Sequence, residues 1–228
     1  MLGTIVNTVA IIVGSLIGYM FKNLIAERYN ENIFKAMSLA VMLVGLQMAL
    51  GTQNILLVIC SLVIGALMGE MINIEEKLDK FGERLQNAFS KGDSRIGQGF
   101  VTASLMFCIG SMAIIGALEG GLLNKHDVLF AKSLLDGIIS VALTASLGIG
   151  VILSSLSVFI YQGSIVLLSS VVKDVMTEMV VREMTAVGGL LIFGIGLNMI
   201  LKDRIKVGNM LPAIFIPIVF FLLTKIAG

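Results

Sequence analysis

The chain carries little charge. Only 14% of its 228 residues are Asp, Glu, Lys or Arg, and its formal net charge is +1 at pH 7. Soluble domains usually carry roughly a quarter of charged residues. Proteins that bind nucleic acid do so largely through clustered basic residues, which a nearly neutral chain lacks. We therefore expect no nucleic-acid partner.

Residues that hold metals or perform acid–base chemistry are also scarce. The chain has one histidine, His126, and two cysteines, Cys60 and Cys108, which lie within apolar runs. A free cysteine in such a run behaves as a small buried hydrophobe, and His126 has no Cys or His neighbour in sequence with which to bind zinc. H-E-x-x-H, G-x-S-x-G and Walker-type motifs are absent as well. We expect no metal site, no cofactor, no enzymatic activity and no ATP-driven transport by this chain alone.

The chain is instead rich in long apolar segments. Hydrophobic residues make up 57% of it, and segments of about 20 apolar residues are what a bilayer core requires. This pattern predicts an all-α, polytopic transmembrane helix bundle of about seven or eight spans, forming one integral membrane domain over residues 1–228. The predicted segments are 4–21, 36–50, 54–70, 100–118, 130–153, 157–172, 184–201 and 208–225.

Some of these segments are not expected to be straight spans. The second and the sixth are short, at about 15 residues each, and a segment shorter than the bilayer core tilts, breaks or re-enters. Whether the fourth and the sixth cross the membrane completely stays open at this stage.

The basic residues indicate the orientation. No Lys or Arg precedes the first apolar run, whereas Lys22 and Arg28 follow it, an order that predicts a retained first span with its N-terminus outside the cytoplasm. Eight crossings from that start place eleven of the 16 basic residues in three cytoplasmic loops. Positive charge in short loops is typical of the cytoplasmic side.

A polar connector over residues 73–95 separates a first half, 1–72, from a second half, 100–228. Its apolar residues recur at spacings of three and four, which predicts one amphipathic helix lying along the cytoplasmic interface. This helix is either a plain connection between the halves or a surface that binds a regulatory partner. The apolar face consists of Ile74, Leu78, Phe81, Leu85 and Phe89.

Two segments share a pattern that predicts an inverted-topology repeat. The segment from Lys35 and the segment from Arg182 both begin basic-x-Met-hydroxyl, and both end Gly-Leu-amide-Met. In the orientation above they run in opposite directions, which is typical of secondary transporters. The repeat makes Gln47 and Asn198 equivalent. An amide within a span must find a partner, so each either bridges helices or binds a solute.

Further polar side chains fall in or beside apolar segments. Lys132 and Asp136 are four residues apart and share one helix face, while Asn7 lies in the first segment and Glu119 at the end of the fourth. A carboxylate within the membrane is costly and is usually functional. Lys132 and Asp136 form either a static structural pair or part of a site in which Asp136, with Glu119, binds a cation or proton.

Several short runs form a combined pattern: GTIVNTVAIIVGSLIG, the GE after the third segment, ASLMFCIGSMAIIGALEGGL, KSLLDG, YQGS, and EMTAVGGLLIFGIGLNM with LPA. Together they resemble a bacterial YqgA/YdfK-like family of multi-spanning membrane proteins of unknown function. The resemblance extends over nearly the whole chain and implies an integral protein of the bacterial plasma (inner) membrane, without naming a substrate. Ser111 departs from the family pattern, in which we expect proline, and this change is expected to relax a kink.

The sequence therefore favours a small secondary transporter or ion-conducting protein, working in the lipid bilayer as a homodimer. The expected substrate is a small solute or a monovalent cation, and the candidate binding residues are Asn7, Gln47, Glu119, Asp136 and Asn198. The alternative is a structural or regulatory protein, a scaffold or sensor, that acts through the amphipathic helix. An intramembrane enzyme would need catalytic groups that the sequence does not contain.

Overall fold

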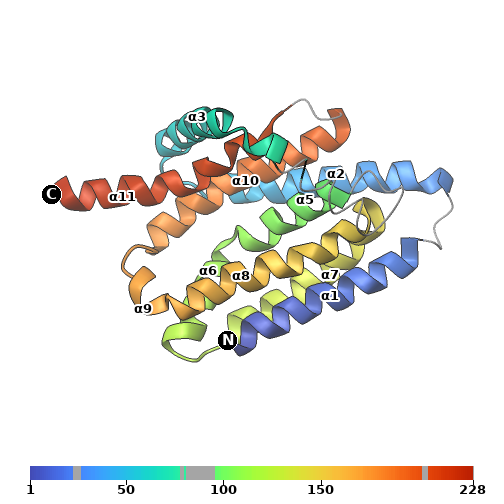
Figure 1. Ribbon diagram of the computed structural model, residues 1–228, viewed down its shortest axis with the longest axis horizontal. Helices are drawn as coiled ribbons and strands as arrows, with labels where there is room; N and C mark the ends of the chain where they lie inside the picture. Colours follow the sequence, from blue (N-terminus) through green and yellow to red (C-terminus); the bar gives the residue numbers. More distant parts are fainter. Residues whose placement is uncertain (23–26, 78–79, 81–95, 202–204, 228) are drawn as a thin grey trace. The chain divides into compact units, whose positions relative to one another are not determined.

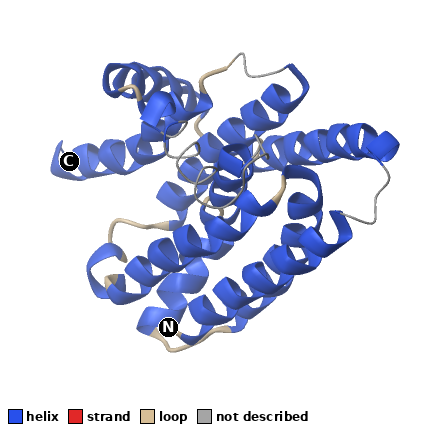
Figure 2. Cartoon of the chain, turned by 45° about the vertical axis from the view of Figure 1, so that its right-hand side comes forward, coloured by secondary structure: helices blue, strands red, loops and turns tan. Residues whose placement is uncertain are grey.

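The computed structural model describes residues 1–22, 27–77, 80, 96–201 and 205–227, and these residues form helices joined by short turns and loops, without a strand (Figure 1, Figure 2). The prediction of an all-α protein is confirmed. Within the described residues, six helical segments are long and apolar enough to cross a membrane: Leu2–Phe21, Ile55–Ile72, Asp127–Leu147, Ile149–Leu167, Glu178–Leu201 and Val207–Lys225.

A bent pair of helices raises the number of candidate spans to seven. Helix α5 (Ile96–Cys108) and helix α6 (Ser111–Leu122) are bent by 57° at the break between them. The break occurs although residue 111 is serine, so a bend forms here without proline. The expectation that the missing proline relaxes a kink stays a prediction. The predicted second span lies in α2 (Glu27–Ala49), whose apolar part, Phe34–Ala49, is shorter than the others.

The boundary between the fifth and sixth predicted segments needs correction. Helix α7 (Asp127–Leu147) ends at Gly148, and η1 (Ile149–Leu153) then leads into α8 (Ser154–Leu167). Gly148 has φ 85°, a left-handed conformation that glycine adopts without steric cost. The sixth span therefore begins at residue 149 rather than 157 and has 19 residues, long enough to cross a bilayer.

The described helices form two compact units, which we describe separately. The first unit comprises Met1–Met37, Asp79–Cys108 and Met112–Ser170. In it, α1 (Leu2–Lys22) lies side by side with α7 (Figure 1). Gly14 approaches Gly137 and Gly18 approaches Val141, so the two helices run parallel, and both glycines are too close to the α7 backbone to carry a side chain. Small residues permit such close approach in membranes.

Helices α5 and α8 complete the first unit. Helix α5 packs on η1 and α8, and α8 also packs on α1. Gly150 lies directly against the backbone of Ile96, which fixes η1 at the start of α5. Met1 lies beside Gly163, near the end of α8, so α1 and α8 run antiparallel.

The second unit comprises Ser38–Leu78, Ile109–Ser111 and Val171–Gly228. Its main helices are the end of α2, α3 (Ile55–Ile72), α10 (Glu178–Leu201), η2 (Val207–Phe215) and α11 (Ile216–Ala227). Gly65 and Gly69 bring α3 against η2, antiparallel. Gly45 on α2 faces Gly189 on α10, while Gly196 faces Met42, so α2 and α10 are antiparallel too. A short helix, α9 (Ser169–Val172), precedes α10.

Each unit combines segments from both halves of the chain. Helices α2 and α10 run in opposite directions, as the inverted repeat requires. The repeat itself stays a prediction, as does the single membrane domain. Asn73 ends α3 with φ 54°, and a helical stretch at 74–77 follows. Most of the predicted amphipathic connector, including 81–95, lies outside the described residues.

We expect Gly14→Ala to destabilise the protein. A Cβ at this position would lie 2.2 Å from the carbonyl oxygen of Gly137, so α1 and α7 must move apart. Overpacking of this kind typically costs about 1–3 kcal/mol. Thermal unfolding in mild detergent measures the loss. Gly163→Ala is the matched control, because its Cβ would meet only the end of the Met1 side chain, at 3.6 Å. Equal unfolding temperatures for the two variants would contradict this account of the α1–α7 contact.

Candidate functional site

A buried ion pair lies on α7 in the first unit. The Lys132 ammonium is 2.9 Å from Oδ1 and 2.8 Å from Oδ2 of Asp136, and the two side chains are 8% and 5% exposed. Asn7 Nδ2 donates to Asp136 Oδ2 at 3.0 Å. We call these three residues the Asn7–Lys132–Asp136 cluster. The prediction that Lys132 and Asp136 meet on one face is confirmed, and the structure adds Asn7 as their partner.

The α1–α7 contact places Asn7 opposite the ion pair. Because Gly3 lies against Leu129 and Ala10 against Gly137, Asn7 falls at the level of the α7 residues between them. The neighbouring hydroxyls on α7 are occupied elsewhere: Ser133 donates to the Leu129 carbonyl and Ser140 to the Asp136 carbonyl. The carboxylate of Asp136 thus receives hydrogen bonds from an ammonium on its own helix and an amide on α1.

Helix α5 packs against α7, the helix that carries Lys132 and Asp136. It ends at Cys108, where the α5–α6 segment is broken. The last carbonyls of a helix have no partner within the helix and form the negative end of its dipole.

Several buried polar atoms in this unit have no hydrogen-bond partner among the described residues. They include Thr4 Oγ1, Asn7 Oδ1 and both amide atoms of Gln162, and all three side chains are fully buried. They come from α1 and α8, which pack together. A buried polar group without a partner costs about 1–3 kcal/mol. Such a group in a native protein usually pairs with water, an ion or a bound molecule when the chain itself supplies no partner.

The remaining predicted binding residues are not in the cluster. Glu119 is half-buried near the end of α6, where its backbone carbonyl accepts from the N–H groups of Leu123 and Lys125. Gln47 is exposed on α2. Asn198 accepts from the Ile205 N–H at 2.9 Å and donates to the Ile205 carbonyl, so its amide closes the loop after α10. This pairing favours a structural role for Asn198.

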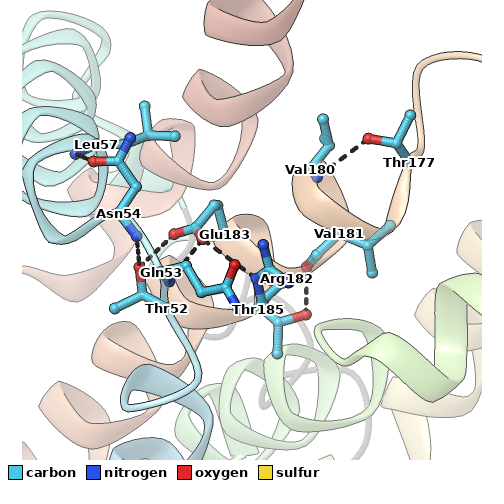
Figure 3. Close-up of polar contacts among 10 residues, drawn as sticks. All are labelled: Thr52, Gln53, Asn54, Leu57, Thr177, Val180, Val181, Arg182, Glu183 and Thr185. Atoms are coloured by element: carbon cyan, nitrogen blue, oxygen red, sulfur yellow. Dashed lines mark hydrogen bonds and ion pairs between the residues drawn. The ribbon is translucent and has the colours of Figure 1, made fainter.

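The second unit contains a buried carboxylate that the sequence analysis missed. Glu183 on α10 is 2% exposed. It accepts hydrogen bonds from the Thr52 hydroxyl and, at 3.0 Å, from the Gln53 N–H, and Arg182 Nε lies 3.6 Å away (Figure 3). Asn54 beside them caps α3 by accepting from the Leu57 N–H. Glu183 thus ties the α2–α3 loop to the first turns of α10. The only signal in the sequence was an acidic residue at the start of an apolar segment.

A further polar junction joins the end of α3 to the start of η2. Glu70 accepts from Lys206 Nζ at 2.7 Å and from Asn209 Nδ2, while Asn209 Oδ1 accepts from the Glu75 N–H at 2.7 Å. The hydrogen bond to Glu70 raises the pKa of Lys206. Every one of these groups serves the connection between two chain segments, so we assign this junction a structural role.

Long apolar helices, a broken helical segment and a buried ion pair define a multi-spanning membrane protein. The chain belongs to the DUF554 family, described as "Protein of unknown function", whose model matches residues 2–222. It is 39% identical to "Uncharacterized membrane protein YdfK" of Bacillus subtilis (strain 168), over 95% of this chain and 94% of that protein. It is 26% identical to "Uncharacterized protein YqgA" of Escherichia coli (strain K12), over 94% of each chain. No solved structure matches it.

We expect the contributions of Lys132 and Asp136 to the free energy of unfolding to be strongly coupled. Removing one partner of a buried pair leaves an uncompensated charge and typically costs about 3–5 kcal/mol, whereas replacing both is often nearly neutral. Asp136→Asn and Lys132→Met should each lower the unfolding temperature in detergent, and the double variant should recover most of the loss. Asp127→Asn, at an exposed position on the same helix, is the control. Additive effects in the double variant would show that the pair is not coupled.

We expect Glu183→Ala to release the α2–α3 loop. Its loss leaves the Thr52 hydroxyl and the Gln53 N–H without their acceptor, at a cost of about 1.5–3 kcal/mol for hydrogen bonds to a charged group. Hydrogen exchange at the Gln53 amide should accelerate on the order of tenfold or more. Glu178→Ala, at an exposed position in the first turn of α10, should leave this exchange unchanged. Slow exchange in Glu183→Ala would mean that other contacts hold the loop.

Proposed function

We propose that this protein is a small secondary transporter or an ion-conducting membrane protein for a small solute or a monovalent cation. The observation that carries the proposal is the Asn7–Lys132–Asp136 cluster, buried between two candidate membrane-spanning helices. Ionisable groups at such depth are expensive and typically line substrate or ion pathways. A purely structural bundle would pack more stably with apolar residues in their place.

The broken α5–α6 segment supports the same proposal. Many transporters bind their substrates where a discontinuous helix exposes free backbone groups near the membrane midplane. Here α5 packs against α7, the helix that carries the ion pair of Lys132 and Asp136. The cluster combines a carboxylate, an ammonium and an amide, groups that recognise a small charged or polar solute.

The charges of the cluster suggest the size and charge of the substrate. It contains one carboxylate and one ammonium, and the described part of the chain holds no group of three His, Cys, Asp or Glu side chains that would suit a metal ion. Asp136 binds one positive charge, which in this structure is that of Lys132. A monovalent cation or the positive group of a small solute takes this position by displacing the Lys132 ammonium, whereas the cluster has no excess positive charge for a polyanion.

We further propose that the protein acts as a homodimer in the bacterial plasma membrane, with its N-terminus outside and without enzymatic activity. Many large apolar side chains on the candidate spans are exposed, which suits contact with lipid or with a second copy. On α3 they include Leu56, Leu67 and Met71.

We expect the purified protein in liposomes to take up at least one member of a panel comprising Na⁺, K⁺ and small neutral or zwitterionic solutes. Asp136→Asn should slow that uptake on the order of tenfold or more, as the loss of a charged contact implies. Uptake is followed with labelled solutes or ion-sensitive dyes rather than by current alone, because an exchange that moves no net charge produces no current.

Two controls separate transport from folding. Asp127→Asn removes an exposed carboxylate from the same helix and should transport as the unmodified protein does. Size-exclusion chromatography reports whether Asp136→Asn remains folded. Uptake no faster than in protein-free liposomes for the whole panel, or full activity in Asp136→Asn, would overturn the proposal.

A further inference from the structure

The Asn7–Lys132–Asp136 cluster is electrically neutral before any substrate enters. The ammonium of Lys132 lies within 3 Å of both carboxylate oxygens of Asp136, so each charge is already compensated. A metal cation that displaced Lys132 would add one buried positive charge to the unit. Because an uncompensated charge in a low-dielectric site is strongly disfavoured, the cluster disfavours a lone cation and a lone anion equally.

A solute with one positive and one negative group satisfies the cluster without this cost. Its ammonium replaces that of Lys132 at Asp136, while its carboxylate pairs with the released Lys132. The ion pair between Lys132 and Asp136 is then replaced by two ion pairs, one from each residue to the solute. The net charge of the site stays zero. The long, flexible side chain of lysine permits such a separation.

The unpartnered polar atoms supply further contacts for such a solute. Asn7 donates to Asp136 through Nδ2, so its unpartnered Oδ1 belongs to an amide that already touches the carboxylate. This oxygen is an acceptor for an ammonium held at Asp136. Thr4 lies one helical turn away on the same face of α1, and its buried hydroxyl also has no partner among the described residues.

Gln162 offers both a donor and an acceptor. Its side chain is fully buried on α8, and neither amide atom has a hydrogen-bond partner among the described residues. The packing of α8 on α1 places it on a helix that contacts the one carrying Asn7 and Thr4. An amide that can both donate and accept suits a solute that carries both kinds of group.

We propose that the substrate of the Asn7–Lys132–Asp136 cluster is a small zwitterion with a primary ammonium and a carboxylate, as in a neutral α-amino acid. Asp136 and Asn7 Oδ1 bind the ammonium, and Lys132 binds the carboxylate. In the absence of substrate, the lysine occupies the position of the ammonium. This inference rests on the proposed function and names its substrate class.

The test is a binding and uptake panel on the full chain. Neutral α-amino acids from glycine to leucine are titrated by calorimetry in detergent and then offered, labelled, to liposomes that contain the protein. For the strongest binder, two analogues with the same carbon skeleton follow: the amine that lacks the carboxylate and the acid that lacks the ammonium. We expect the zwitterion to bind at least about tenfold more tightly than either analogue.

Variants of the two charged residues should change this preference in opposite directions. Lys132→Met leaves a net negative site and should favour the amine, whereas Asp136→Asn leaves a net positive site and should favour the acid. Lys125→Met and Asp127→Asn, both at exposed positions, should keep the preference for the zwitterion. If a single variant does not fold, the neutral double variant Asp136→Asn/Lys132→Met should remain folded and lose binding of the zwitterion.

The outcomes distinguish this inference from the function on which it rests. Transport of Na⁺ or K⁺ that depends on Asp136, without binding of any amino acid, would overturn the inference and leave the proposed function standing. Equal binding of the amine, the acid and the zwitterion would also overturn it, as would zwitterion binding retained in the double variant. No transport of any solute in the panel would overturn both.

Discussion

The charge of Asp136 is the constraint around which the first unit is organised. A carboxylate in a membrane interior must be compensated at short range, because neither lipid nor apolar side chains solvate it. Lys132 supplies the opposite charge from the next turn of α7, and Asn7 supplies a hydrogen bond from α1. The hydrogen bond from Asn7 requires α1 and α7 to approach closely. Gly14 and Gly18 permit this approach, because they lie directly against the α7 backbone.

The second unit handles its polar groups differently. Glu183 is bonded to Thr52 and Gln53, while Asn198 is bonded to both backbone groups of Ile205. These side chains are used to fix loops to helix ends, and they are satisfied by the chain itself. In the first unit, by contrast, Asn7, Thr4 and Gln162 keep polar atoms without partners among the described residues. This difference is the reason for proposing solute binding in the first unit, although Arg182 Nε in the second unit also has no hydrogen-bond partner among the described residues.

The sequence predicted the helical class because apolar length alone decides it, and it predicted the Lys132–Asp136 contact because a spacing of four residues is local. It identified Asn7 as a candidate binding residue but not its hydrogen bond to Asp136, because the two residues are 129 positions apart. The glycines of α1 indicate close helix packing without identifying α7 as the partner. The turn at Gly148 was missed because the sequence remains apolar on both sides of it, with no charged residue or proline to mark a boundary. Glu183 was missed because its partners, Thr52 and Gln53, lie in a distant loop.

That separation of 129 residues also has a consequence for biogenesis. Chains are synthesised at about 5–20 residues per second, so α1 enters the membrane roughly 6–26 s before α7 is complete. During that interval the Asn7 amide has no carboxylate to pair with, and α1 must be held in the bilayer by its apolar residues alone. The first unit is therefore assembled late, from helices that are inserted separately, and a nascent chain released before α7 would present an unpaired amide to the membrane's quality-control machinery.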